Sequence, residues 1–207
     1  MTRLAVLVFV GSLLGPVSLA AQIVPVNDFC GGVSVLTTPG ADASDSARHT
    51  LIGWHASASQ RIKKADEYSP GHDHSPLAFV GDFGGQFGTT ADGSPLHVYE
   101  YLGGIRLRAG RMTTTPSGGK RVDPTSVFVH ALYGVSHRRA GPTSETGLMM
   151  GYGGGVDVDL TSGPATAAYA FGVRTQFDWL PSRTNGAWAN KQFRFAVGVV
   201  FMARYWD

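Results

Sequence analysis

The sequence predicts an all-β protein, an eight-stranded antiparallel up-and-down transmembrane β-barrel. Apolar and polar residues alternate with a period of two in eight segments, which are separated by clusters of Pro, Gly, Ser, Thr, Asn and Asp. The segments have about ten residues or more, the length with which a tilted strand crosses a bilayer. Charged residues make up only 15% of the 207-residue chain, against roughly 25% in soluble domains. Glycine, with 28 copies, suits many turns and strands that approach one another closely.

Residues 1–20 are predicted to be a secretory signal peptide. Arg3 precedes an apolar run, and small residues follow that run. We expect cleavage after Ala20, with Ala21 as the neighbouring alternative. The apolar run is too short to be a membrane-spanning helix. The chain is therefore divided into a signal peptide, 1–20, and a barrel domain, 21–207.

The first four strands are predicted over residues 29–38, 50–62, 77–88 and 96–109. Each carries one apolar row, whose members lie two positions apart. The rows are Val33 and Val35; Ile52, Trp54, Ala56 and Ala58; Leu77, Phe79, Phe83 and Phe87; and Tyr99, Tyr101, Ile105 and Leu107. Most residues between them are small or polar, so each strand has two unlike faces.

The last four strands are predicted over residues 125–138, 146–160, 167–180 and 193–207. Their apolar rows are Val127, Val129, Ala131, Tyr133 and Val135; Leu148, Met150, Tyr152, Val156, Val158 and Leu160; Tyr169, Phe171, Val173, Phe177 and Trp179; and Phe193, Phe195, Val197, Val199, Phe201 and Tyr205. Phe128 and Leu132 fall on the opposite row of the fifth strand and blur its phase. The eighth strand alternates almost without error, and we expect it to close the barrel by pairing with the first.

The apolar rows are predicted to face outward, towards lipid. An eight-stranded barrel has an interior only just wide enough for side chains. Four or five large apolar side chains from each strand would overfill that interior, whereas the Gly, Ala and Ser of the opposite rows, with a limited set of charges, fit. A soluble barrel would have no reason to present rows of Phe and Tyr to water. A closed barrel also satisfies every backbone polar group inside a membrane.

The opposite rows are predicted to form a structural network of polar side chains in the lumen. Enclosed charges need partners, and both signs are available. The candidates are His55, Arg61, Asp82, Glu100, Arg106, Arg108, His130, Asp157, Asp159, Arg174, Asp178, Arg194 and Arg204. In so narrow a barrel we expect these groups to form a plug of ion pairs rather than to line an ion path.

The barrel is predicted to lie in the outer membrane of a double-membraned bacterium, because the chain carries an export signal and its aromatic residues suit two interfacial girdles. These aromatic residues, near strand ends, are Trp54, Tyr99, Trp179, Tyr205 and Trp206. Both termini are expected in the periplasm. The loops near 39–49, 89–95, 139–145 and 181–190 are then expected to face outward.

Several stretches carry a resemblance: "RVDPTSVFVHALYGVSH", "GYGGGVDVDL", "FDWLPSR" and "NKQFRFAVGVVF", together with "GWHASAS" and "FVGDFGG". They resemble the strands of small bacterial outer-membrane β-barrel proteins, the OmpA-transmembrane-like or opacity/porin family. The resemblance covers roughly residues 50–205. It implies a monomer in contact with outer-membrane lipids, inserted by the barrel-insertion machinery. The stretch "KKADEYSPGHDHSP" departs from the family pattern, because it is longer than the tight periplasmic turn expected there.

Barrels of this family usually end on an aromatic residue of the last strand, which the insertion machinery recognises. In this chain that residue is Phe201 or Trp206. Asp207 departs from the pattern and is expected to be a polar residue at the periplasmic rim.

The expected function is structural, surface-interacting or a minor permeation role, with no enzyme activity, cofactor or nucleic-acid partner. The first alternative is a lipid-modifying barrel enzyme, because His55 and Ser57 share a face and could make a nucleophile. That face is the lumen row, which lipid acyl chains do not reach, and no third member is evident. His72, Asp73 and His74 could contact a metal, but they lack a fixed third ligand, so we expect a solvated loop and no metal site. The second alternative is a soluble secreted ligand-binding barrel.

Overall fold

The computed structural model describes residues 27–39, 48–62, 76–90, 92–114, 120–161, 169–184 and 187–203. Three expectations concern residues outside these ranges: the signal peptide with its cleavage at Ala20, the loop with His72, Asp73 and His74, and the residues from Arg204 to Asp207.

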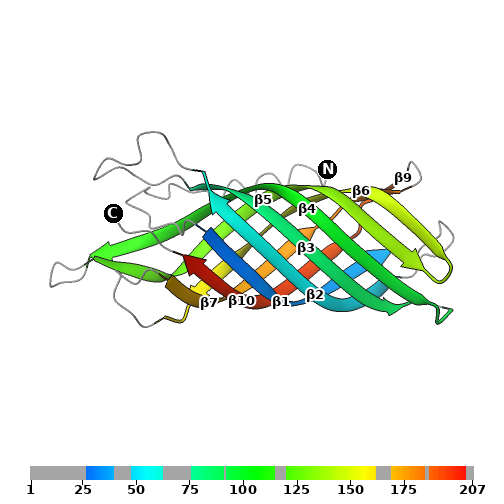
Figure 1. Cartoon of the computed structure of the whole chain (residues 1–207), viewed down its shortest axis with the longest axis horizontal. Helices are drawn as coiled ribbons and strands as arrows, with labels where there is room; N and C mark the ends of the chain where they lie inside the picture. Colours follow the sequence, from blue (N-terminus) through cyan, green and yellow to red (C-terminus); the bar gives the residue numbers. More distant parts are fainter. Residues whose placement is uncertain are drawn as a thin grey trace, which may run out of the picture.

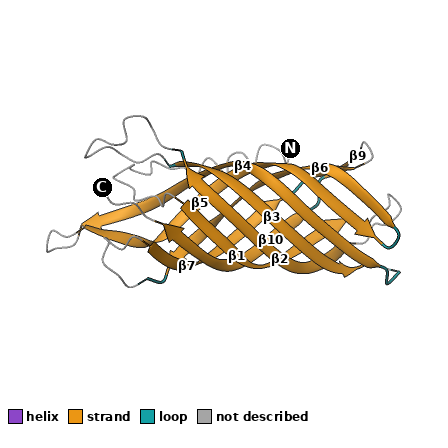
Figure 2. Ribbon diagram, viewed as in Figure 1, coloured by secondary structure: helices purple, strands orange, loops and turns teal. Residues whose placement is uncertain are grey.

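One antiparallel sheet contains all the strands of the described residues. They are β1 (Asn27–Pro39), β2 (Arg48–Arg61), β3 (Leu77–Thr89), β4 (Pro95–Thr114), β5 (Lys120–Ala140), β6 (Thr143–Asp159), β7 (Tyr169–Trp179), β8 (Ser182–Thr184), β9 (Ala187–Ala189) and β10 (Phe193–Ala203). Strands pair in the order β5-β4-β3-β2-β1-β10-β7-β6, and β5 also pairs with β6. The eight long strands therefore close into a barrel, whose tilted wall is visible in Figures 1 and 2. The described residues contain no helix long and apolar enough to cross a membrane.

The predicted fold class is confirmed, since the eight strands expected from the alternation are the eight that close the barrel. β10 pairs with β1 from Thr37↔Phe193 to Asn27↔Ala203, so the last long strand does close against the first. β4 and β5 are longer than predicted, with 20 and 21 residues. Their hairpin projects beyond its neighbours at the end of the barrel that carries β1's first residue and β10's last (Figure 1).

The expectation of a plain loop over 181–190 is wrong, because this stretch contains the short strands β8 and β9. β8 continues β7 along β6 in an unchanged register: Tyr152 pairs with Trp179, and Leu148 pairs with Arg183. Pro181 lacks an N–H and interrupts the ladder, but its carbonyl still accepts a hydrogen bond from the Met150 N–H (2.9 Å). β6 extends beyond the end of β7, and β8 pairs with this additional part of β6.

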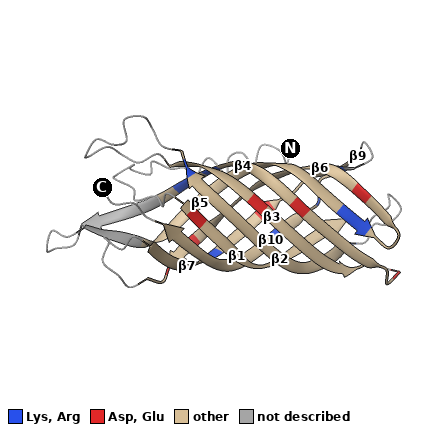
Figure 3. Ribbon diagram, in the orientation of Figure 1, with Lys and Arg blue, Asp and Glu red and all other residues tan. Residues whose placement is uncertain are grey.

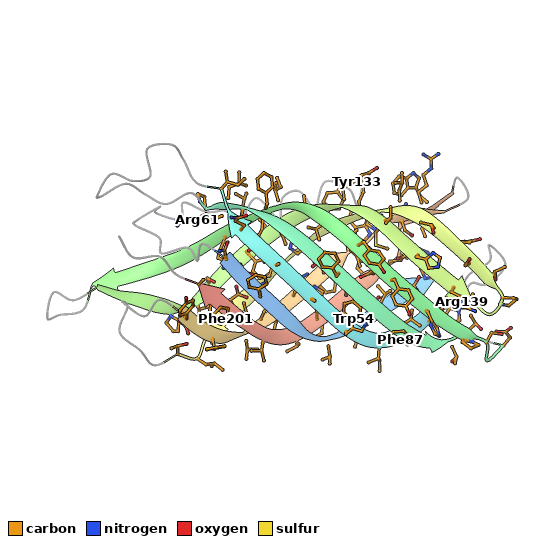
Figure 4. All side chains as sticks on the ribbon, in the orientation of Figure 1. Trp54, Arg61, Phe87, Tyr133, Arg139 and Phe201 are labelled. Carbon is orange, nitrogen blue, oxygen red and sulfur yellow. The ribbon has the colours of Figure 1, made fainter. Side chains whose placement is uncertain are left out.

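The predicted apolar rows lie on the outside of the wall. The exposed fractions of Phe29, Val33 and Val199 are 58%, 66% and 61%. Figure 4 shows Trp54 and Phe201, among other aromatic side chains, on the outer surface. The rows between them are buried. Charged positions are few along the strands (Figure 3).

The uncertain phase of the fifth predicted strand is settled by burial. Phe128 and Leu132 of β5 are each only 3% exposed, so they point into the lumen. Val127, Val129 and Tyr133 are 51%, 47% and 55% exposed and point outward. A lumen filled by side chains accepts a few large apolar groups on the inner row, which is why the sequence alternation is imperfect here.

The two ends of the barrel differ in what they carry. We call one the terminus end: it holds Asn27 of β1 and Ala203 of β10, together with the β2–β3, β4–β5 and β6–β7 connections. We call the other the loop end: it holds the β1–β2, β3–β4, β5–β6 and β7–β10 connections. The four loops predicted to lie together therefore share one end. Figure 4 shows Arg61 near the terminus end and Arg139 near the loop end.

Two strand glycines on opposite faces make a matched pair for mutation. A Cβ on Gly153 of β6 would lie 2.1 Å from Asp178 Oδ1 and 2.4 Å from the Phe177 carbonyl oxygen, whereas a Cβ on Gly31 of β1 would meet nothing within 4 Å. We expect Gly153→Ala to lower the free energy of unfolding by about 1–3 kcal/mol, because backbone and a paired carboxylate must move. Gly31→Ala should change it by less than about 0.5 kcal/mol. Urea unfolding in detergent measures both, and equal effects would show that close strand approach at Gly153 does not matter.

Candidate functional site

The centre of the lumen is organised by one guanidinium, that of Arg194 on β10. Its Nη2 donates to Asp82 Oδ1 (2.8 Å) and to Asp178 Oδ2 (2.7 Å), its Nη1 donates to Glu100 Oε2 (2.7 Å), and its Nε donates to Asp178 Oδ2 (3.0 Å). All four side chains are completely buried. Each comes from an inward row, so β3, β4, β7 and β10 are joined at one point inside the barrel. We call this group the Arg194 cluster.

Two histidines extend the Arg194 cluster. His55 Nε2 lies 2.8 Å from Asp82 Oδ2, and His130 Nε2 lies 2.8 Å from Asp178 Oδ1. These contacts bring β2 and β5 into the same network. The cluster thus places three carboxylates around one guanidinium, with an imidazole beside two of them.

Two glutamines supply further hydrogen bonds to the same carboxylates. Gln176 Nε2 donates to Asp178 Oδ2 (2.9 Å) and to Asp82 Oδ2 (3.4 Å). Gln86 Nε2 donates to the Ser34 hydroxyl (3.2 Å) and to Glu100 Oε2 (3.5 Å). Buried carboxylates need hydrogen-bond donors for their oxygen atoms. These two amides donate to carboxylate oxygens in addition to Arg194.

A second group of charges lies towards the terminus end, and we call it the Asp28 cluster. Arg174 binds Asp157 through two hydrogen bonds, Nε–Oδ1 (2.7 Å) and Nη2–Oδ2 (2.9 Å), and it also donates from Nη2 to Asp28 Oδ1 (2.8 Å). Arg106 Nη1 donates to Asp28 Oδ1 (3.3 Å). Arg108 Nη2 is 3.0 Å from Asp28 Oδ2 and 2.9 Å from Asp157 Oδ2. Three guanidiniums therefore share two carboxylates.

Phe128 lies among the arginines of the Asp28 cluster. The Cζ atoms of Arg106, Arg174 and Arg108 are 4.5, 4.9 and 5.9 Å from the centre of its ring. A phenyl ring attracts cations to its face, and this attraction is stronger where water is excluded. The aromatic residue that blurred the alternation of β5 thus contacts the cations of the lumen.

The lumen also contains an apolar cluster, which the sequence analysis did not anticipate. Its buried members are Leu36, Leu51, Val80, Leu96, Val98, Leu102, Leu132, Met149 and Leu180. Leu36 pairs with Leu51 on β2 and with Arg194 on β10, so apolar packing lies directly beside the Arg194 cluster.

Most of the predicted lumen residues are buried inside the barrel. Arg61 is one of them, with 7% of its surface exposed. Asp159 lies at the rim, where its Oδ1 accepts a hydrogen bond from the Thr161 N–H (2.8 Å), and Arg204 lies outside the described residues. Asp28, which is 1% exposed, is a lumen residue that was not predicted, because the first strand was expected to begin at residue 29. Extending the inward row two positions back from Cys30 would have found it.

The structure separates the two residues that suggested a nucleophile. His55 is bonded to Asp82, whereas the Ser57 hydroxyl accepts a hydrogen bond from Arg174 Nη1 (3.2 Å). Both side chains are 3% exposed and face the lumen. Asp82 does supply an acid beside His55, but Arg194 also holds that acid. Among the described residues, no group of three or more His, Cys, Asp or Glu could hold a metal ion.

Comparison with known structures supports the fold. Neisserial surface protein A (NspA) superposes with a TM-score of 0.55 at 12% identity, over 86% of this chain and 96% of that one. Ail, the attachment invasion locus protein of Yersinia pestis, gives a TM-score of 0.49 at 10% identity, over 86% of this chain and 97% of that one. No protein-family model and no curated protein matches the sequence. At this level of identity the likeness to NspA concerns the fold alone, an eight-stranded up-and-down barrel.

Proposed function

We propose that this chain is an integral β-barrel of the bacterial outer membrane, with a structural or surface-contact role. One observation supports this most directly: an outer surface of exposed Phe, Tyr, Trp, Val and Ile encloses a lumen of ion pairs. In water that surface would be unstable. In lipid it is the favourable face, and the closed ladder joins all eight long strands to a neighbour on both sides.

A filled lumen argues against a transport role. The Arg194 cluster joins opposite sides of the barrel, and the apolar cluster occupies the lumen beside it. Eight strands leave an interior that side chains alone can fill. We propose that the protein does not conduct solutes of ordinary size.

An enzymatic role finds no support in the lumen. His55 and Ser57 are bonded to different partners, and both are buried where a lipid acyl chain would have to displace the Arg194 cluster. We propose that these side chains stabilise the barrel, and that the protein is not a lipid-modifying enzyme.

The loop end is proposed to face the cell exterior. The exposed basic side chains described there are Arg48, Arg139, Arg183 and Lys191. Asp92, in the β3–β4 turn, accepts hydrogen bonds from Thr90 and Ser94, and these bonds lower its pKa below the usual value. These basic side chains of the described residues, above an apolar band, suit contact with the phosphates of a lipid leaflet.

The location is tested by fractionation and surface labelling of cells that express the chain. We expect recovery in the outer-membrane fraction and labelling of a Pro142→Cys variant by a membrane-impermeant thiol reagent. The natural Cys30 is buried and should give little background. Recovery in the soluble periplasm without detergent would favour the secreted-barrel alternative instead.

The non-conducting role is tested with purified protein in lipid vesicles that are loaded with a small sugar. We expect the vesicles to retain the sugar, and rapid efflux of the sugar would refute this role.

A charge on the outer surface tests the lipid contact itself. Val199 lies on the outward row of β10, paired with Gly31 and Val173, and is 61% exposed. We expect Val199→Arg to lower the free energy of unfolding in phospholipid vesicles by about 2–4 kcal/mol, because a guanidinium near mid-membrane is poorly solvated. Val199→Leu is the matched control and should be near neutral. Similar stability of Arg and Leu variants would mean that this face does not contact hydrocarbon.

A further inference from the structure

The Asp28 cluster holds more buried positive than negative charge. Arg106, Arg108 and Arg174 are each 4% exposed or less, and the carboxylates that contact them are those of Asp28 and Asp157. The surplus is one positive charge (three guanidiniums less two carboxylates). Isolated charge is costly in a dry interior. The hydrogen bonds and ion pairs of these three arginines go to Asp28, Asp157 and Ser57, whereas the carboxylates of the Arg194 cluster bind Arg194.

Several buried donors of this cluster have no hydrogen-bond partner. They are Nε and Nη2 of Arg106 and Nε and Nη2 of Arg108. Arg108 Nη2 lies within ion-pair distance of both carboxylates, but its N–H bonds do not point at them. Arg174, by contrast, donates from all three of its nitrogens. The unmet donors are thus confined to two residues of β4, two positions apart on the inward row.

A fifth unmet nitrogen lies on the neighbouring strand. His130 of β5 pairs directly with Arg106 across the ladder, and its Nδ1 is buried without a partner, while its Nε2 is bonded to Asp178. Phe128, two positions from His130, lies 4.5 Å from Arg106 and pairs with Arg108. The unmet nitrogens of Arg106, Arg108 and His130 therefore belong to one patch of the β4–β5 hairpin.

We propose that this patch binds a small inorganic anion of the halide class, chloride in the cell, between Arg106 and Arg108 and beside His130. A halide accepts several N–H donors at once and cancels the surplus charge. A water molecule can accept hydrogen bonds but leaves the charge uncompensated. The side chains that fill the lumen exclude larger organic anions.

The test uses the folded barrel in detergent, with bromide as the probe. We compare thermal midpoints in sodium bromide and in sodium gluconate at equal ionic strength, so that surface charges are screened equally. We expect bromide to raise the midpoint saturably, by roughly 5 °C, since a ligand that binds only the folded state stabilises it by mass action. Crystals grown in bromide should show an anomalous peak in contact with Arg106.

Arg106→Met distinguishes this site from bromide bound elsewhere. The variant has two guanidiniums facing two carboxylates, so it should be at least as stable as the wild type in gluconate and should lose the bromide response. Arg139→Gln, on the outer surface, should keep the response. Equal wild-type midpoints in the two salts without an anomalous peak would overturn the proposal. A bromide response that survives in Arg106→Met would overturn it as well.

Discussion

Replacing Arg194 with Met is expected to remove at least about 3–5 kcal/mol from the free energy of unfolding, because it leaves buried carboxylates without their counter-charge. Asp82, Glu100 and Asp178 all accept hydrogen bonds from this one guanidinium, and all are completely buried. His55 and His130 can compensate only in part, since each already contacts one carboxylate. We expect the variant to give little barrel that resists urea in detergent or migrates in the folded position on a gel without boiling.

Two further variants make the result specific. Arg139→Gln, which removes an exposed arginine of the outer surface, should change stability by less than about 0.5 kcal/mol. Adding Glu100→Gln to Arg194→Met should recover part of the loss, because it removes one of the uncompensated charges. If Arg194→Met folds with wild-type stability, the network is a by-product of packing and does not hold the barrel together. If the double variant is less stable than the single one, the loss comes from the cavity and not from the charges.

The sequence predicts the wall of this barrel well, because successive residues of a strand point to opposite faces and these two faces differ in polarity. Val33, Phe79 and Val199 each lie on the row expected from the period, and their exposure agrees with the volume argument that turned the apolar rows outward. Strand ends are less well determined by this signal. Asp28 was missed for that reason, since a single inward residue beyond Cys30 adds little to a pattern.

The lumen is harder to predict than the wall, because periodicity says which residues point inward but not which of them meet. Arg194 and Glu100 are 94 positions apart in sequence and bond at 2.7 Å. These two side chains come into contact because of the register of all the strands around the closed barrel. The alternation within one strand does not determine that register. The apolar cluster has the same origin: Leu36 and Leu180 read as interruptions of a polar row until closure brings such residues together.

β8 pairs with β6 because β6 is longer than its neighbour β7. β6 has 17 residues and β7 has 11, so part of β6 would lack a partner if the chain turned immediately after Trp179. The polar composition of "PSRTNGAWANK" gives a loop signal, and tertiary context overrides it. An exposed edge beside a long strand is sufficient to convert such a segment to short strands.

Deleting the chain from Phe193 onward is expected to abolish assembly of the barrel altogether. Every residue of β10 from Phe193 to Ala203 pairs with both β1 and β7. Without it, two long edges would face hydrocarbon, where each unsatisfied backbone group costs several kcal/mol. The deletion also removes Arg194, so the lumen loses its central cation at the same time as the wall opens. We expect no folded species by gel mobility and no protein in the outer-membrane fraction.

A shorter truncation separates closure from recognition by the insertion machinery. Ending the chain at Ala203 keeps all of β10, including Phe201, which stacks on Tyr169 with ring centres 5.4 Å apart. If Phe201 is the terminal aromatic that the machinery recognises, this truncation assembles normally; if Trp206 has that role, it folds from urea into detergent but fails to assemble in cells. Both truncations are therefore compared by refolding in detergent and by expression. Assembly of the chain that lacks Phe193 onward would mean that β10 is not the strand that closes this barrel.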